Sequence, residues 1–212
     1  MVSSGPGAEE LRTTQPHGGL SLRRELARKG LHLLSLIVPV SYAAGVSRSL
    51  VIWVLAFALA TALAVEMGRR RSARAGALFD STVGGLLRDH ERRSASGATW
   101  LIVALLIAVV CLPRDIAIAA MCAVALGDAA AAIAGRALTR TTSHRKSFSG
   151  SAACFAASAI TARAIAQFAW REALIVGILA AVAERPRRPL DDNLRIVIVV
   201  GCGILLWRMG FS

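Results

Sequence analysis

Aromatic residues are scarce in this sequence: they make up 5% of the 212 residues, and only one of them is a tyrosine. Because few aromatics are present and basic residues interrupt long apolar runs, a nucleic-acid-binding domain is not expected. The four cysteines lie inside apolar stretches without metal-ligand spacing. They are therefore interpreted as small buried side chains rather than as a secreted disulfide scaffold. Residues 1–19 lack the apolar core of a secretory signal and are expected to form a polar tail.

Acidic residues are also few. Thirteen acids face 25 basic residues, which leaves a net charge of +12. The chain is nevertheless 55% hydrophobic, with a mean hydropathy of +0.57, whereas soluble domains lie near 45–50% apolar. This apolar content excludes a disordered chain. A chain that is both basic and apolar must segregate the two kinds of residue along its length.

The apolar residues fall into seven blocks, and strand-like alternation persists nowhere. The blocks run roughly Leu31–Val46, Leu50–Gly68, Ala98–Leu112, Ile116–Ala134, Ala152–Trp170, Ala173–Ala183 and Leu194–Phe211. A helix needs about 20 residues to cross a bilayer. Four blocks are long enough, the first and third are slightly short, and the sixth is short enough for a re-entrant or tilted segment. The pattern predicts an all-α polytopic membrane protein with about seven transmembrane helices, in which residues 20–212 form one integral-membrane domain.

The basic residues predict an orientation. With a cytoplasmic amino terminus and seven crossings, twenty of the 25 cations fall on the cytoplasmic side, four fall outside, and Arg163 lies within the fifth helix with no assigned role. Most acids and histidines fall on the same face, and only Asp115 and Glu172 lie outside. A site on the cytoplasmic face is therefore expected. Arginine outnumbers lysine 23 to 2, which favours a bacterial plasma membrane over endoplasmic reticulum.

The first polar motif contains Glu25, Arg28, Lys29 and His32, whose spacing places them on one face of a helix. One interpretation is an interfacial amphipathic helix with solvated basic groups. The other is a cationic clamp for phosphate, in which Glu25 orients Lys29.

The second feature is Asp128, about 12 Å along a helix from Arg136 at its inner end. A carboxylate at this depth is typical of a functional site, although it could simply pair with a buried arginine. Gly127, Ala131 and Gly135 form a stripe of small residues. The stripe would permit close helix packing or the approach of a nucleotide to the backbone.

The segment from Arg136 to Ser151 ends in two cations, several hydroxyls and a glycine before a helix. Such a segment suits a polyphosphate, because backbone N–H groups and the positive helix end would face it. The candidate contacts are Lys146, Ser147, Gly150 and Ser151. No P-loop motif is present, so a standard ATP-binding fold is not expected. An ordinary positive-inside loop is the alternative.

Two adjacent carboxylates, Asp191 and Asp192, begin the last helix. They are either helix caps or, with Glu184 and Asn193 nearby, ligands for a Mg²⁺ ion shared with phosphates.

Four motifs, in order, resemble the CTP-dependent lipid kinases, a family that includes dolichol kinase, phytol kinase and CTP-using diacylglycerol kinase and is related to phosphatidate cytidylyltransferases. The motifs are Glu25–His32; His90–Thr99; Gly127-Asp128 through Gly135-Arg136 with Lys146-Ser147 and Gly150-Ser151; and Ala183-Glu184 followed by Asp191–Leu194. Two positions depart from the family pattern. Thr139 replaces a second glycine, and Ser149 replaces a glutamate.

The resemblance implies phosphoryl transfer from CTP, with Mg²⁺, to the hydroxyl of a lipid alcohol that enters from the bilayer. It implies that Arg28, Lys29, Asp128, Gly135 and Lys146 are essential. The CTP phosphates are expected to contact Arg28, Lys29, Lys146 and the Gly150–Ser151 backbone. Gly127, Arg136 and His32 are further candidates for contact with the nucleotide. Asp128, Asp191, Asp192 and Glu184 are the candidate metal ligands.

Three questions stay open at this point. Either Asp128 or Asp191 could accept the hydroxyl proton. Nucleotidyl transfer from CTP to a lipid phosphate is an alternative reaction at the same site. A transporter or a non-catalytic membrane protein is a further alternative, although the one-sided polar cluster and the lack of midplane helix breaks in paired halves argue against a transporter.

Overall fold

The computed structural model describes residues 22–87, 91, 94–138, 147–185 and 190–211, and within these residues it contains helices and no strand. The α-helices are α1 Leu22–Leu34, α2 Ile37–Ala43, α3 Arg48–Arg71, α4 Ala73–Thr82, α5 Gly97–Cys111, α6 Arg114–Cys122, α7 Asp128–Leu138, α8 Phe148–Ala164, α9 Trp170–Glu184 and α10 Asp192–Phe211. A 3₁₀ turn covers Gly84–Leu86, and a π-helical segment, Ala123–Gly127, joins α6 to α7. The predicted all-helical architecture is confirmed.

Three described helices are long and apolar enough to cross a membrane: Arg48–Arg71, Arg114–Gly135 and Asp192–Gly210. Helix α5 is apolar but shorter, with 15 residues, and α8 and α9 have 17 and 15. The first apolar block is split between α1 and α2. These apolar helices support an integral membrane protein, whereas the count of seven crossings and the cytoplasmic amino terminus stay predictions.

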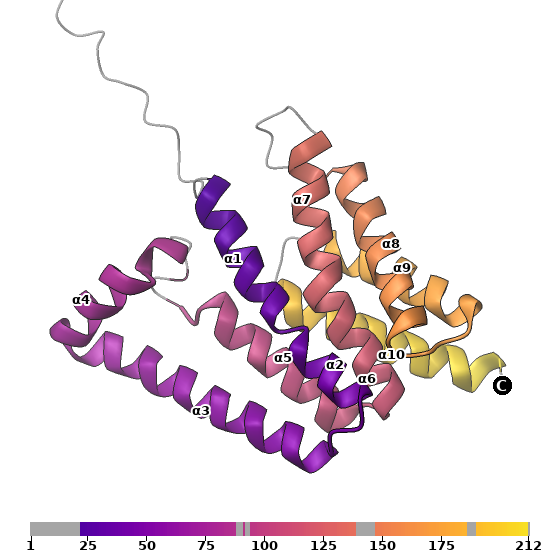
Figure 1. The fold of residues 1–212 in the computed structure, drawn as a ribbon, viewed down its shortest axis with the longest axis horizontal. Helices are drawn as coiled ribbons and strands as arrows, with labels where there is room; N and C mark the ends of the chain where they lie inside the picture. The colour runs from indigo at the N-terminus through magenta and orange to yellow at the C-terminus, as the bar shows by residue number, and fades with distance from the viewer. Residues whose placement is uncertain (1–21, 88–90, 92–93, 139–146, 186–189, 212) are drawn as a thin grey trace, which may run out of the picture.

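The helices form a connected series (Figure 1). Contacts run from α4 to α3, then to α5, α10, α9, α8 and α7, while α6 packs against α2, α5, α8 and α10. The helix from Arg114 to Gly135 is therefore central, and 72% of its apolar window is buried, against 17% for α3. This difference places α3 at the outside of the bundle.

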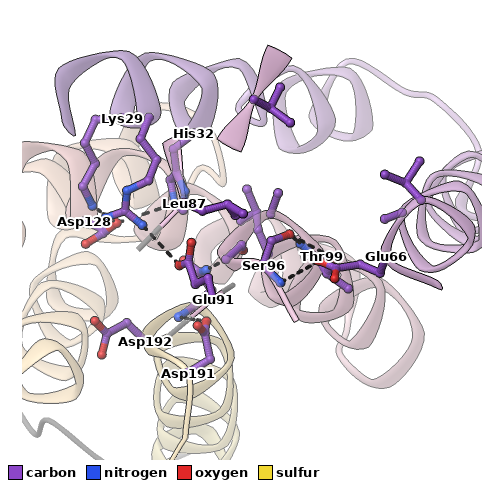
Figure 2. A pocket seen from close by; sticks show the side chains of 18 of the residues that line it. Lys29, His32, Glu66, Leu87, Glu91, Ser96, Thr99, Asp128, Asp191 and Asp192 are labelled. Carbon is purple, nitrogen blue, oxygen red and sulfur yellow. Dashed lines mark hydrogen bonds and ion pairs between the residues drawn. The ribbon is translucent and has the colours of Figure 1, made fainter. Parts of the chain in front are cut away.

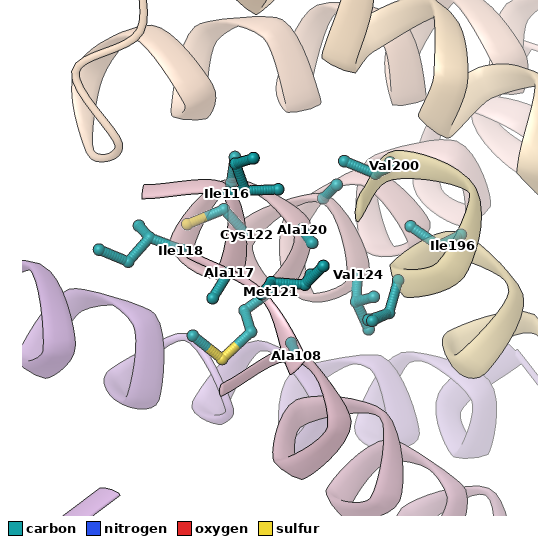
Figure 3. Packing of buried hydrophobic residues seen from close by; sticks show 14 of the residues in the cluster. Ala108, Ile116, Ala117, Ile118, Ala120, Met121, Cys122, Val124, Ile196 and Val200 are labelled. Carbon is teal, nitrogen blue, oxygen red and sulfur yellow. The ribbon is translucent and has the colours of Figure 1, made fainter. Parts of the chain in front are cut away.

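The core is built around α6 (Figure 3). Ile116 and Met121 on this helix are fully buried, as are Ile196 and Val200 of α10. Many of the intervening residues are alanines, which allow the helix backbones to approach closely. In a membrane this close packing, rather than transfer from water, stabilises the contacts between helices.

Serine residues begin four of the helices. The side chains of Ser47, Ser72, Ser96 and Ser147 each accept a hydrogen bond from the backbone N–H three residues later, at 3.1–3.4 Å. An N-terminal backbone N–H has no partner within its own helix, and a serine cap satisfies it. These caps define the starts of α3, α4, α5 and α8.

The small-residue stripe of the central helix packs against α8. A Cβ atom added to Gly127 would lie 2.5 Å from Ser158 Oγ, and one added to Gly135 would lie 3.1 Å from Ser147 Oγ. A Cβ on Gly150 would lie 2.9 Å from the backbone oxygen of Ala131. Of the two interpretations of the stripe, the structure supports helix packing.

The fifth apolar block ends earlier than the sequence predicts. Helix α8 stops at Ala164 instead of continuing to Trp170, so Arg163 lies in its last turn and not well inside a helix. Its guanidinium lies 5.9 Å from the centroid of the Trp170 ring. A cation in the last turn interacts favourably with the negative end of the helix dipole. Arg163 is thus explained by its position at a helix end.

Candidate active site

A cavity of about 370 Å³ lies between α1, α3, α4, α5, the central helix and the start of α10. Its volume is in the usual range for small-molecule sites. Six predicted site residues line it: Arg28, Lys29, His32, Asp128, Asp191 and Asp192. They come from three separate parts of the chain and lie around one space (Figure 2).

Lys29 and Asp128 form an ion pair between α1 and the first residue of α7. The side chains are largely buried, with 8% and 18% of their surfaces exposed. The alternative prediction paired Asp128 with a buried arginine, but its partner is this lysine. Removing one member of a buried ion pair leaves the other charge without compensation, so each residue depends on the other. A phosphate entering the cavity would meet the ammonium group and the carboxylate together.

His32 lies one helical turn after Lys29 and faces the same carboxylate. Its Nε2 atom lies 3.2 Å from the carbonyl oxygen of Val124 and 3.7 Å from Asp128 Oδ2. Because a carbonyl oxygen only accepts hydrogen bonds, Nε2 is the donor. This hydrogen bond connects α1 to the segment that precedes Asp128.

The π-helical segment ends directly before Asp128. Val124, whose carbonyl faces His32, belongs to this segment. Such interruptions of an α-helix occur frequently at functional sites. Periodicity in the sequence does not reveal this segment, because Ala, Val and Leu give the same apolar pattern in either helical form.

Glu91 is a cavity residue to which the sequence assigned no role. It is 5% exposed, and its Oε1 atom lies 4.0 Å from a terminal nitrogen of Arg28. In Figure 2 it lies between the Lys29–Asp128 pair and the group formed by Ser96 and Thr99. The available signal was an acid among the arginines of the second-to-third loop, inside the motif His90–Thr99.

Asp191 and Asp192 have different surroundings. Asp191 accepts a hydrogen bond of 2.9 Å from the backbone N–H of Asn193, which is a capping interaction. Burial raises the pKa of Asp191, and the negative charges of Asp192 and Glu91 raise it further. Asp192 forms an ion pair with Arg195. The capping interpretation is thus supported for Asp191, and its carboxylate also faces the cavity.

Glu66 connects the outer helix to the start of α5. Its carboxylate accepts hydrogen bonds from Arg69 Nε at 2.9 Å and from the backbone N–H of Ser96 at 2.8 Å. Ser96 caps α5, and its hydroxyl lies 3.1 Å from that of Thr99. Glu66 and Thr99 are both buried and line the cavity. This network holds one wall of the cavity together.

Other predicted residues lie elsewhere. Ser147, Gly150, Ser151, Gly127, Gly135 and Glu184 are not among the described residues that line the cavity. Ser147 caps α8, and its Oγ lies 3.0 Å from that of Ser149, while Ser151 and Glu184 are buried on α8 and α9. Thr139 and Lys146 lie outside the described residues, as do the side chains of Glu25 and Arg136. The nucleotide contacts predicted for these residues stay predictions.

The carboxylates do not form a metal site by themselves. Within the part of the chain that the structure describes, no three His, Cys, Asp or Glu side chains are grouped closely enough to hold a metal ion. Mg²⁺ commonly uses one or two protein carboxylates and completes its shell with water and phosphate oxygens. Asp128 and Asp191, which line the cavity, fit such a shared arrangement. Glu184 is not among the described residues that line the cavity, and its role as a metal ligand stays a prediction.

The fold and the cavity describe a helical membrane protein with a buried charged pocket near one end of its bundle. No protein-family model matches the chain, and no solved structure matches it significantly. The chain is similar to CTP-dependent diacylglycerol kinase 1 of Saccharomyces cerevisiae, with 27% identity over 155 residues. The match covers 71% of this chain and 53% of the relative, so the chain spans about half the length of the curated relative it matches. This similarity supports the resemblance to the CTP-dependent lipid kinases.

Proposed function

We propose that this protein is an integral-membrane kinase that transfers the γ-phosphate of CTP to the hydroxyl of a lipid alcohol. The observation that carries the proposal is a cavity whose lining combines the Lys29–Asp128 pair with further charged groups and with apolar residues. The similarity to a CTP-dependent diacylglycerol kinase supports it independently. The acceptor is a polyprenol, a phytol-like alcohol or a diacylglycerol, and the site lies at the cytoplasmic face.

The chemistry of phosphoryl transfer matches these groups. The reaction depends mainly on alignment of the reactants and on neutralisation of phosphate charge. Arg28 and Lys29 bind the phosphates, and the hydrogen bond from His32 to Val124 holds the π-helical segment that precedes Asp128. Buried surroundings strengthen each of these interactions by excluding water.

A magnesium ion, when bound, would supply further neutralisation of the phosphate charge. Asp128 and Asp191 are the residues that would hold it. The proton of the acceptor hydroxyl goes to one of the carboxylates that line the cavity. Glu91 joins Asp128 and Asp191 as a candidate acceptor of this proton, because it lies between the Lys29–Asp128 pair and Ser96 in Figure 2.

The test is an acceptor screen with CTP labelled on the γ-phosphate, run in parallel with γ-labelled ATP. Polyprenol, phytol, diacylglycerol and phosphatidate are each supplied to the purified protein in lipid nanodiscs. We expect label to enter one of the lipids from CTP. Release of the label as pyrophosphate, with the cytidylyl group on a lipid phosphate, would support the nucleotidyltransferase instead. Absence of any CTP-dependent product would contradict both reactions.

A further inference from the structure

The lining of the cavity contains two chemically different sets of residues. One set is charged and contains the ion pair and the carboxylates described above. The other set is apolar and consists of Ala62 and Val65 of α3, Phe79 of α4, and Val83, Leu87 and Leu101. A lipid alcohol combines a polar hydroxyl with a hydrocarbon chain, and a mixed lining can contact both.

Two apolar residues of the lining are also accessible. Val65 and Val83 line the cavity, and 47% and 39% of their surfaces are exposed. We take this accessible part of the lining, between α3 and the end of α4, as the opening of the cavity. The outer surfaces of these two helices are apolar, since Leu63 and Met67 of α3 and Leu78 of α4 are 48%, 48% and 67% exposed. Such surfaces suit hydrocarbon rather than water.

Helix α4 is held firmly against α3 beside the opening. The guanidinium of Arg69 lies 5.2 Å from the centroid of the Phe79 ring, and it also binds Glu66. A Cβ atom on Gly76 would lie 3.1 Å from the backbone oxygen of Arg69, so the two backbones are close. The opening is thus a built feature of the α3–α4 pair.

The apolar lining and the charged cluster belong to the same cavity, since Val65 of α3 and Asp128 at the start of α7 both line it. A hydroxyl group could therefore reach the charged cluster while its hydrocarbon chain remained against the apolar residues.

We propose that the opening between α3 and α4 is the entry and binding site for the hydrocarbon chain of the acceptor lipid. The chain lies against Ala62, Leu87 and Leu101, and the hydroxyl points toward Glu91 and the Lys29–Asp128 pair. This inference rests on the proposed function for the identity of the occupant. It adds the side of the bundle from which the lipid enters and the residues that contact its chain.

Two alanines on α3 provide a matched test. Ala62 is half-buried and lines the cavity, whereas Ala64 is exposed and is not a lining residue. We expect Ala62→Phe to raise the KM for a long-chain acceptor about tenfold, because the ring fills the space of the chain. The KM for CTP should change by less than about twofold. Ala64→Phe should leave both constants unchanged. Equal acceptor constants in the two variants would overturn the proposal.

A second measurement does not depend on turnover or on a bulky substitution. Ala62→Cys and Ala64→Cys are each treated in nanodiscs with a hydrophobic maleimide, with and without added hexadecanol, and modification is mapped by peptide mass spectrometry. Hexadecanol should slow modification at position 62 at least threefold and have no effect at position 64. Equal protection at both positions, or none at position 62, would overturn the proposal.

The two experiments separate this inference from the proposed function. If the acceptor screen finds no phosphoryl transfer but hexadecanol protects position 62, the kinase assignment fails and the chain-binding site stands. If phosphate is transferred but Ala62→Phe behaves like Ala64→Phe, the kinase assignment stands and the chain-binding site fails.

Discussion

Two groups of charged residues lie near opposite ends of the bundle. One lines the cavity, and the other is centred on Arg208, which forms ion pairs of 2.7 Å with both Asp115 and Glu172. Asp192 and Arg208 are sixteen residues apart on α10, or about 24 Å. Both groups contain arginine, aspartate and glutamate, but one borders a cavity and the other joins the ends of three helices.

The difference between the two groups shows how a charged residue in an apolar sequence can be interpreted. Asp115 and Glu172 share one arginine, whose guanidinium also lies 5.0 Å from the centroid of the Phe168 ring. These contacts connect the central helix, α9 and α10, which explains all three charges as structural. In the other group, Asp128 is likewise paired, yet the pair faces a cavity with further carboxylates. Access to a cavity, rather than charge itself, separates a candidate site from a structural ion pair.

The largest predicted effect compares one acid from each group. Asp128→Asn should lower phosphoryl transfer by at least about 10²-fold, because it removes the charge that faces Lys29. Asp115→Asn should leave turnover per folded molecule within about twofold, since this residue faces Arg208. Rates with labelled CTP, normalised to monodisperse protein, measure both. Near-normal activity of Asp128→Asn would mean that the charged group at the cavity is no more important for activity than the group centred on Arg208.

The second prediction tests whether the contact of the π-helical segment with α8 is packing or part of the nucleotide site. Gly127→Ala should destabilise the protein by about 1–3 kcal/mol, because its Cβ would lie 2.5 Å from Ser158 Oγ. Gly68→Ala is the control, since a Cβ there meets nothing within 4 Å, and it should be neutral or stabilising by up to about 1 kcal/mol. Thermal unfolding in detergent measures the difference. Equal unfolding temperatures would argue against a packed contact.

The third prediction concerns the structural group. Arg208→Met should lower stability by about 1–2 kcal/mol, because Asp115 and Glu172 lose their shared partner while remaining partly exposed to solvent. Phosphoryl transfer per folded molecule should not change. A selective loss of activity, with an unchanged unfolding temperature, would mean that this end of the bundle also contributes to function.

The smallest effect is expected at a helix cap. Ser147→Ala should lower stability by about 1 kcal/mol through loss of the hydrogen bond from the Gly150 N–H, and Ser47→Ala at the start of α3 should do the same. The KM for CTP should stay within about twofold in both variants. An increase in this constant for Ser147→Ala alone would establish the phosphate contact that the sequence predicts there.

Much of the candidate site follows from local sequence patterns. Arg28, Lys29 and His32 were expected on one helix face, and the structure places all three at one cavity. Asp128 and Asp191 were singled out as carboxylates within or beside apolar helices, and they face the same space. Such predictions succeed because helix periodicity fixes which residues share a face.

Other features were not accessible to the same reasoning. The partner of Asp128 is 99 residues away in the chain, so no local pattern identifies Lys29. Glu91 lies in a polar loop without periodicity, and its burial depends on helices from other parts of the sequence. The early end of α8 was missed because the residues after Ala164 continue the apolar composition without continuing the helix.

The sequence by itself determined that this protein is helical and rich in apolar segments, because the order of side chains fixes local periodicity and hydropathy. It also determined which charged residues interrupt those segments. The tertiary structure alone shows which charges meet, which helix is central and which is exposed, and that charged and apolar residues of separate helices line one cavity. These properties depend on contacts between residues far apart in the chain, which arise from the packing of helices and are not encoded in any single segment.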